Sequence, residues 1–212
     1  MFFFGYVFVL LHIASSKPLK SHRINKRYVL NNQIWDDCVI TWAFRDPFEL
    51  FDNDVDYDVA KTVLQKVMDT WERSAGGALT FVDLSPRNRS SPENKKRKAK
   101  LDVMFARFDH GDLEAFDGPG GMVAHSGYPP DGIIHFDASE KWTISDSKTD
   151  DFFVDLRYVA LHEVGHALGL HHSTYPFAIM NPFYSNKSTS FSYELSKDDI
   201  YGIQDLYSNC VQ

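Results

Sequence analysis

The chain has 212 residues, 43% of them hydrophobic and 15% aromatic, which suits one globular domain with a full hydrophobic core. This composition excludes a wholly disordered protein. The formal net charge of -7 and the isoelectric point near 5.7 argue against a nucleic-acid partner for the chain as a whole.

The first 16 residues, MFFFGYVFVLLHIASS, form an apolar run that ends in small residues. The run is shorter than the roughly 20 apolar residues of a membrane span and is typical of a signal-peptide core, although no Lys or Arg precedes it. We therefore expect a signal peptide at 1–16 and secretion; an uncleaved membrane anchor is the alternative. Lys26-Arg27 predicts a processing site that ends a pro-segment at 17–27 and leaves a domain at 28–212, or else these residues form a basic solvated linker.

Two cysteines, Cys38 and Cys210, lie near opposite ends of the expected mature chain. In an oxidising compartment they predict a disulfide between the first strand and the last helix. Closing so long a loop stabilises the fold by several kcal/mol, on the order of 4. The alternative is a free thiol that caps a zinc ion, but neither neighbourhood is built to activate a thiolate.

The hydrophobic pattern predicts strands at 38–44, 79–84 and 101–108, and helices at 57–74, 151–168 and 196–207. Gly76-Gly77 closes the first helix, and Ser196 is the expected N-cap of the last. The basic stretch 85–100 reads as an exposed loop, with polyanion binding as the alternative. Asn88 and Asn186 begin glycosylation motifs, which matter in a secreted chain. Without an internal repeat, these elements predict one α+β domain.

The stretch HEVGHALGLHH, residues 162–172, concentrates histidines beside a glutamate. On a helix His162 and His166 project from one face and can chelate one ion, and Gly169 lets the chain turn back to offer a third ligand. Zinc held by three imidazoles keeps an open position and lowers the pKa of its water to about 7. Glu163 would take that water's proton as it attacks a carbonyl, then hand it to the leaving amine. A bare HExxH can arise by chance, but HExxHxxGxxH is complete here.

These residues match the metzincin zinc-binding motif at every fixed position, which assigns the third ligand to His172 and leaves His171 at a variable position. Ser173 directly after it resembles the matrix metalloproteinase (matrixin) branch, and Met180 lies where that family has its Met-turn beneath the metal. By the same resemblance Pro182 and Tyr184 would line the S1′ pocket. Tyr158 occupies the position that limits the depth of this pocket in some members, which implies a fairly shallow apolar site.

A second histidine cluster, in the segment 110–142, strengthens the resemblance. Three histidines and an aspartate without an open position would make a closed, structural zinc site, as in the matrixin loop: His110, Asp112, His125 and His135. Scattered loop histidines are otherwise more often incidental.

The same segment carries oxygen ligands for calcium. Calcium would take the carboxylates of Asp117, Asp137 and Glu140 and, by resemblance, the carbonyls of Gly118, Gly120 and Met122. Alternatively, these acidic residues only stabilise turns in an exposed loop. The stretch between His125 and His135 is about three residues shorter than in matrixins and lacks their Gly-x-Gly-x-Asp loop, so a second calcium is not expected, although Asp102 occupies a plausible ligand position.

The resemblance covers about Tyr28 to Tyr207. It implies a twisted five-stranded mixed sheet, mostly parallel with one antiparallel edge strand, and three helices. The stretch 121–125, with Val123 and Ala124, resembles the edge strand that pairs with an extended substrate. The freed amine of Tyr28 would pair with Asp198. On this resemblance we expect neither a cysteine switch nor a hemopexin-like domain, and a pro-segment of at most a dozen residues.

The resemblance implies a secreted, monomeric zinc endopeptidase with two zinc ions and at least one calcium ion. It would cleave extracellular matrix or other secreted proteins before an apolar P1′ residue. Proteinaceous metalloproteinase inhibitors would bind to it. One alternative is a catalytically silent binding module, against which the intact Glu163 argues. Another, an unrelated intracellular zincin, is disfavoured by His172, Met180 and the apolar N-terminus.

Overall fold

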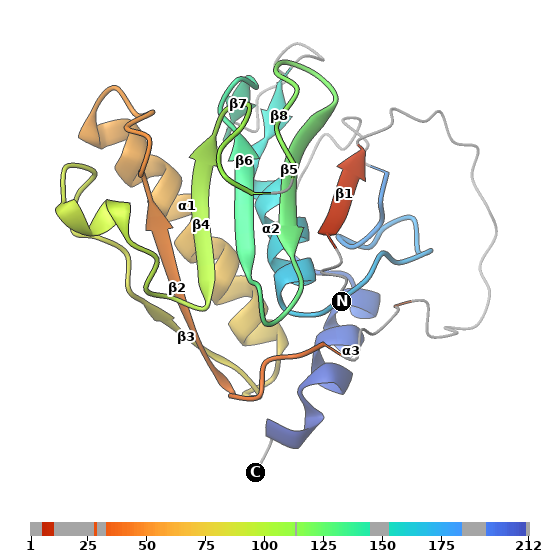
Figure 1. Ribbon diagram of the computed structural model, residues 1–212. Helices are drawn as coiled ribbons and strands as arrows, with labels where there is room; N and C mark the ends of the chain where they lie inside the picture. The colour runs from red at the N-terminus through yellow and green to blue at the C-terminus, as the bar shows by residue number, and fades with distance from the viewer. Residues whose placement is uncertain are drawn as a thin grey trace, which may run out of the picture.

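The computed structural model describes residues 6–10, 28, 33–112, 114–144, 153–183 and 194–210. Its main sheet contains the five strands expected from the sequence, and three helices accompany it (Figure 1). These strands are β2 (Val39–Arg45), β3 (Thr80–Asp83), β4 (Leu101–Ala106), β5 (Met122–Gly127) and β6 (Ile133–Asp137). They lie in the order β5-β6-β4-β2-β3, and only β5 runs antiparallel to its neighbour in this group. The predicted mixed sheet is confirmed.

A sixth strand departs from the expectation. The segment β1 (Tyr6–Leu10) pairs antiparallel with the outer side of β5, so that Val7 lies opposite Ser126. In the full chain, β5 is therefore not the outermost strand of the sheet; the predicted edge at 121–125 belongs to the domain at 28–212 and stays a prediction. The apolar stretch at the N-terminus supplies a strand whose backbone occupies that edge (Figure 1).

The three helices begin at capping residues. α1 (Asp54–Ser74) begins three residues before the predicted start because the side chain of Asn53 accepts a hydrogen bond from the amide of Asp56. α2 (Leu156–Ala167) begins five residues later than predicted, because 154–155 form the short strand β8 (Val154–Asp155) beside β7 (Trp142–Thr143). α3 (Lys197–Leu206) begins after Ser196, as expected, in a complete capping box. Single 3-10 turns are η1 (Pro92–Lys95) and η2 (Ser208–Cys210).

Helices α1 and α2 lie side by side behind the sheet in Figure 1. Every residue of α2 except Tyr158 is buried. The indole N–H of Trp71 on α1 donates a hydrogen bond to the carbonyl of Leu161 on α2 at 3.1 Å. A helix enclosed in this way holds its side chains in a fixed frame, which matters because the HExxH residues lie on it.

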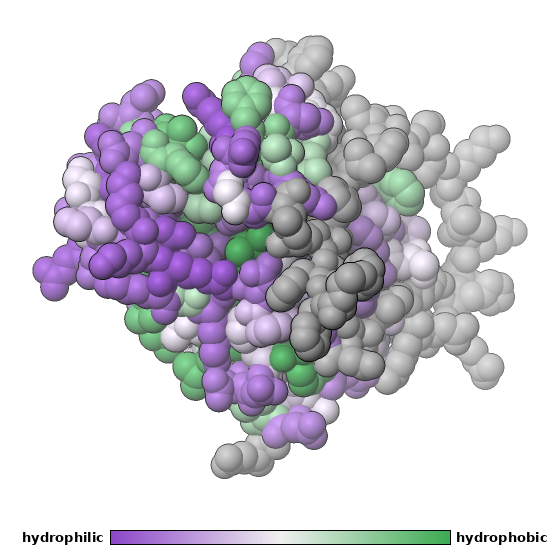
Figure 2. All heavy atoms as spheres, in the orientation of Figure 1, coloured by the Kyte–Doolittle hydropathy of each residue, from purple (hydrophilic) through white to green (hydrophobic). Residues whose placement is uncertain are grey.

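The basic stretch 85–100 is balanced by acidic partners. Figure 2 shows hydrophilic side chains gathered on the side of the molecule where this stretch and β2 lie. Five of its basic side chains form ion pairs with acids from other segments or from η1: Arg89–Asp54, Lys95–Glu49, Arg97–Asp131, Lys98–Glu93 and Lys100–Asp37. This pairing favours the interpretation as a solvated loop over a polyanion-binding surface.

A disulfide joins Cys38 to Cys210 across 172 positions of the chain. It connects the start of β2 to the turn that follows α3, so the two ends of the domain are tied together (Figure 1). Among the helices of the described residues, none has the length and apolar character needed to cross a membrane.

Candidate active site and metal centres

The first candidate metal centre is built from α2 and the loop that follows it. His162, His166 and His172 each offer a ring nitrogen, and these three atoms lie within 4.8 Å of one another. His162 and His166 are one helical turn apart, with their Nε2 atoms 3.0 Å apart. Gly169 takes a φ of 105°, which a residue with a Cβ atom rarely adopts, and this turn brings His172 back to the helix.

The hydrogen bonds on the far side of these rings identify the free nitrogens. Nδ1 of His162 lies 2.7 Å from the carbonyl oxygen of Ile179, and Nδ1 of His166 lies 2.6 Å from that of Leu170. Because a carbonyl only accepts, each Nδ1 carries the ring proton. Burial lowers the pKa of His162 to about 3 and that of His166 well below its usual value, so both rings are neutral at pH 7.

Two Nε2 lone pairs therefore face each other, and the buried Nε2 of His172 has no hydrogen-bond partner among the described residues. Lone pairs at this distance repel unless a cation lies between them. Three imidazoles, two of them with their second nitrogens anchored to carbonyls, are the donor set of a catalytic zinc site, so the residues fit that ion.

Glu163 lies on the same helix turn and is fully buried. Burial raises the pKa of its carboxyl to about 8, against which a hydrogen bond from Ser126 acts. The Ser126 hydroxyl donates to Oε2 at 2.6 Å, while Oε1 is buried without a partner among the described residues. The site thus combines three histidines that can bind a metal ion with one Glu163 oxygen that is free to accept a proton.

Met180 supports the site from beneath. A Cβ atom added to Gly165, which lies between the two helical ligands, would come within 2.3 Å of the Met180 sulfur. Asp199, the third residue of α3, accepts hydrogen bonds from the amides of Ile179 and Met180 at 2.9 and 3.1 Å. Since the Ile179 carbonyl accepts from His162, Asp199 fixes the turn that orients a ligand.

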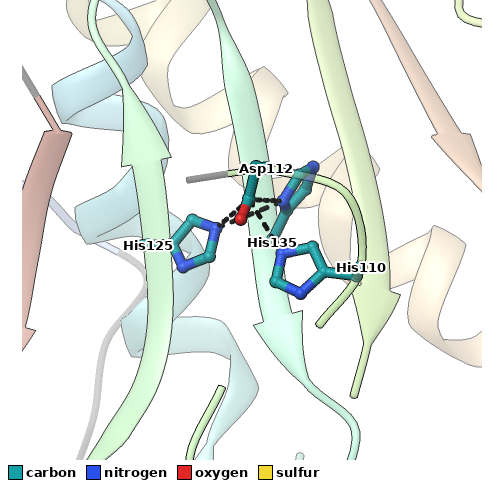
Figure 3. A group of neighbouring side chains, drawn as sticks. All are labelled: His110, Asp112, His125 and His135. Atoms are coloured by element: carbon teal, nitrogen blue, oxygen red, sulfur yellow. Dashed lines mark hydrogen bonds and ion pairs between the residues drawn. The ribbon is translucent and has the colours of Figure 1, made fainter. Parts of the chain in front are cut away.

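The second candidate centre lies on the sheet (Figure 3). His125 and His135 project from β5 and β6, and His110 and Asp112 come from the segment after β4. Nitrogens of the three histidines lie 2.7 to 2.9 Å from one oxygen, Oδ2 of Asp112. The four predicted residues therefore converge on one point.

The donor set at this point also fits a metal. Nδ1 of His110 lies 2.7 Å from the Phe108 carbonyl, so in the neutral ring its Nε2 faces the Asp112 oxygen with a lone pair. Burial lowers the pKa of His125 to about 4. Burial alone would raise the pKa of Asp112, but hydrogen bonds from His135 and the Glu114 amide hold it below its usual range. Three imidazoles around one carboxylate, with no open position, are typical of structural zinc.

Comparison with known sequences agrees with this geometry. The matrixin family model matches residues 34–208, which include both centres. The chain belongs to the matrixin family. It is 38% identical to matrix metalloproteinase-16 of Homo sapiens over 191 residues, 89% of this chain and 30% of that protein. It is 34% identical to matrix metalloproteinase-25 of Mus musculus (90% and 29% covered) and 36% identical to stromelysin-3 of Mus musculus (89% and 34% covered). The chain thus spans about a third of the length of these relatives.

The predicted calcium ligands of this matrixin are less tightly grouped than the residues of the two histidine clusters. Glu140 accepts a hydrogen bond from the Gly120 amide at 2.5 Å, and Asp117 accepts one from the Met122 amide at 3.2 Å. Asp137 is buried, with one carboxylate oxygen unpartnered among the described residues. Burial raises the pKa of Glu140, and the negative charges of Asp137 and Asp117 add to the effect. The described groups with ligand atoms within 4.8 Å of one another are the two histidine clusters.

Asp102, the plausible ligand position for a second calcium, forms a buried bidentate ion pair with Arg45 at 2.5 and 2.6 Å. The guanidinium provides the positive charge at this position.

The predicted substrate residues are only partly described. Val123 and Ala124 are buried on β5, whose outer side is paired with β1. Tyr158 is half-buried, and its hydroxyl donates to the Ile179 carbonyl at 3.5 Å. Pro182 is also half-buried, whereas Tyr184 lies outside the described residues, as does Asn186. Tyr28 is described, and its hydroxyl donates to Asp205; the expected pairing of its freed amine with Asp198 stays a prediction.

Three residues of the site were missed from the sequence: Ser126, Tyr128 and Asp199. The Tyr128 hydroxyl lies 2.7 Å from Nδ1 of His171, and its ring packs edge-on against His166. His171 therefore contacts Tyr128, the residue that packs against the zinc-ligand candidate His166. Only Asp199 had a local signal, because it stands at the third position of a helix capped by Ser196.

Proposed function

We propose that this matrixin is a secreted zinc-dependent endopeptidase. The observation that carries the proposal is the pair of facing Nε2 lone pairs on His162 and His166, with the buried Glu163 carboxylate on the same helix turn. Membership of the matrixin family supports it, as do relatives that are named matrix metalloproteinases. The silent binding module is disfavoured because such a module has no need of the buried Glu163.

His162, His166 and His172 would hold the zinc ion, whose positive charge would lower the pKa of a water molecule to about 7 and favour the ionised form of Glu163. Glu163 accepts the proton of the attacking water on Oε1 and returns it to the nitrogen of the broken peptide bond. The two products carry the water's hydroxyl and proton, so the carboxylate is regenerated. The second centre, with its closed donor set, ties β5 and β6 to the segment after β4, and a calcium ion at Asp117, Asp137 and Glu140 would stabilise the same region.

The substrate class we propose is an extended segment of an extracellular matrix protein or other secreted protein, with an apolar residue at P1′. An extended peptide would add to the outer edge of β5 at Val123 and Ala124 by β-augmentation. Tyr158, Pro182 and Tyr184 would border the P1′ side chain. We further propose that the domain acts as a monomer and is a target of proteinaceous metalloproteinase inhibitors.

Zinc removal tests the enzyme directly. We expect a quenched peptide with an apolar P1′ residue to be hydrolysed by the protein, turnover to fall to background with a zinc chelator, and added zinc to restore it. Metal analysis should give two zinc ions per chain. A protein that carries zinc but shows no chelator-sensitive turnover contradicts the enzyme proposal, and one zinc ion per chain contradicts the structural site.

Removal of the N-terminal residues that carry β1 should raise activity. We propose residues 1–16 as a signal peptide and 17–27 as a pro-segment, and their removal takes away β1, whose backbone occupies the edge of β5. A chain retaining residues 1–27 should therefore show a higher KM than the chain cut after Arg27, with both proteins carrying the same zinc content. The comparison is a peptide-hydrolysis assay before and after cleavage, and equal KM values would show that β1 does not compete with substrate.

A further inference from the structure

The strand β5 presents consecutive side chains to two different sites. Successive residues of a strand point to opposite faces, so His125 and Ser126 face different ways. Nε2 of His125 lies 2.7 Å from Asp112 in the second centre. The Ser126 hydroxyl lies on the other face, 2.6 Å from Oε2 of Glu163 on α2. The strand β5 therefore links the second centre to the Glu163 carboxylate in the first centre.

The contact between Ser126 and Glu163 is enclosed and short. Both residues have 0% exposure, so no bulk solvent competes for the hydrogen bond. Its length lies at the short end of the range for O–H···O hydrogen bonds. With the carboxylate ionised beside a bound zinc ion, this hydrogen bond would belong to the charge-assisted class, which is about twice as strong as a neutral one. Oε2 is thereby occupied, whereas Oε1 has no partner among the described residues.

We propose that Ser126 is a positioning residue for peptide hydrolysis: its hydroxyl holds Oε2 of Glu163 and leaves Oε1 as the oxygen that accepts and returns the proton. This inference rests on the proposed function. A freely rotating carboxylate would exchange its two oxygens and lose the fixed alignment on which proton transfer depends. With Oε2 bound throughout, the same oxygen, Oε1, takes the proton from the attacking water and passes it to the leaving amine.

The test compares three variants of the protein expressed from the full chain and processed alike. Ser126→Ala should lower kcat by roughly 10- to 100-fold, the worth of a hydrogen bond to a charged group, while KM stays within about twofold. Ser126→Thr keeps the hydroxyl on a residue that suits a strand and should recover most of kcat. Thr70→Ala, which removes a buried hydroxyl bonded to Lys66 within α1, should leave kcat unchanged. All should carry the zinc content of the unmodified protein.

A purely structural role would give a different pattern. If Ser126→Ala keeps the kcat of the unmodified protein, or if Ser126→Thr retains zinc but does not recover kcat, the proposal is overturned. A thermodynamic cycle provides a readout that needs no turnover: unfolding free energies of Ser126→Ala, Glu163→Ala and the double variant should be non-additive, and additive values overturn the contact. An inactive unmodified protein would count against the proposed function, while this cycle would still test the contact.

Discussion

Glu163→Gln is expected to lower kcat by about 10²- to 10⁴-fold, the range that general acid–base catalysis contributes. The amide has the size of the carboxyl but cannot take a proton from water at neutral pH, so the loss arises in the chemical step. The substrate edge on β5 and the three histidines are untouched, so KM and zinc content should stay close to those of the unmodified protein. Peptide hydrolysis and metal analysis on the same preparation measure both quantities.

A matched control is available on the other helix. Glu72→Gln alters a carboxylate that accepts a hydrogen bond from the Phe81 amide on β3, and we expect it to leave kcat unchanged. If Glu163→Gln retains more than about a tenth of kcat, another group must be the base. A loss of zinc together with activity would instead place Glu163 in the assembly of the metal centre.

Replacing both Cys38 and Cys210 by alanine should lower the free energy of unfolding by about 2–5 kcal/mol. The disulfide closes a loop of 172 positions, so its removal gives the unfolded chain many more conformations to lose on folding. For a domain of this size, each kcal/mol corresponds to a fall of about 2–4 °C in Tm. Denaturant unfolding monitored by tryptophan fluorescence would measure the change.

The reduced form of the unmodified protein provides the control. A phosphine reductant should destabilise the unmodified protein by about as much as the double substitution does, and it should have no effect on the double variant. Equal unfolding midpoints with and without reductant would contradict the stabilising role of the bridge.

The metal ligands were the most predictable part of the molecule. HExxHxxGxxH encodes helical spacing and a turn within eleven residues, so the positions of His162, His166 and His172 follow from local geometry. The resemblance extended this to the second cluster, whose four residues converge as predicted. The sheet and its three helices were also predicted, with errors of a few residues at the starts of α1 and α2, where capping by Asn53 and Asp155 decides the boundary.

Contacts between distant segments could not be predicted in this way. Alternation along a strand indicates that Ser126 points away from His125, but it does not say that α2 lies beneath it. The hydrogen bonds from Ser126 to Glu163 and between Tyr128 and His171 span 37 and 43 positions. The pairing of β1 with β5 depends on a segment whose apolar composition indicated a signal peptide, and composition does not name a partner strand.

The bond from Asp199 to the turn at Met180 has a consequence for the order in which the protein matures. His162 is held by the Ile179 carbonyl, and the amide of Ile179 is in turn held by Asp199 on α3. During synthesis, therefore, the stretch 162–172 with its three histidines can leave the ribosome while Asp199, which fixes the turn that holds His162, is still untranslated. The orientation of the first histidine therefore depends on a helix that is made last, so this part of the centre is completed late in folding.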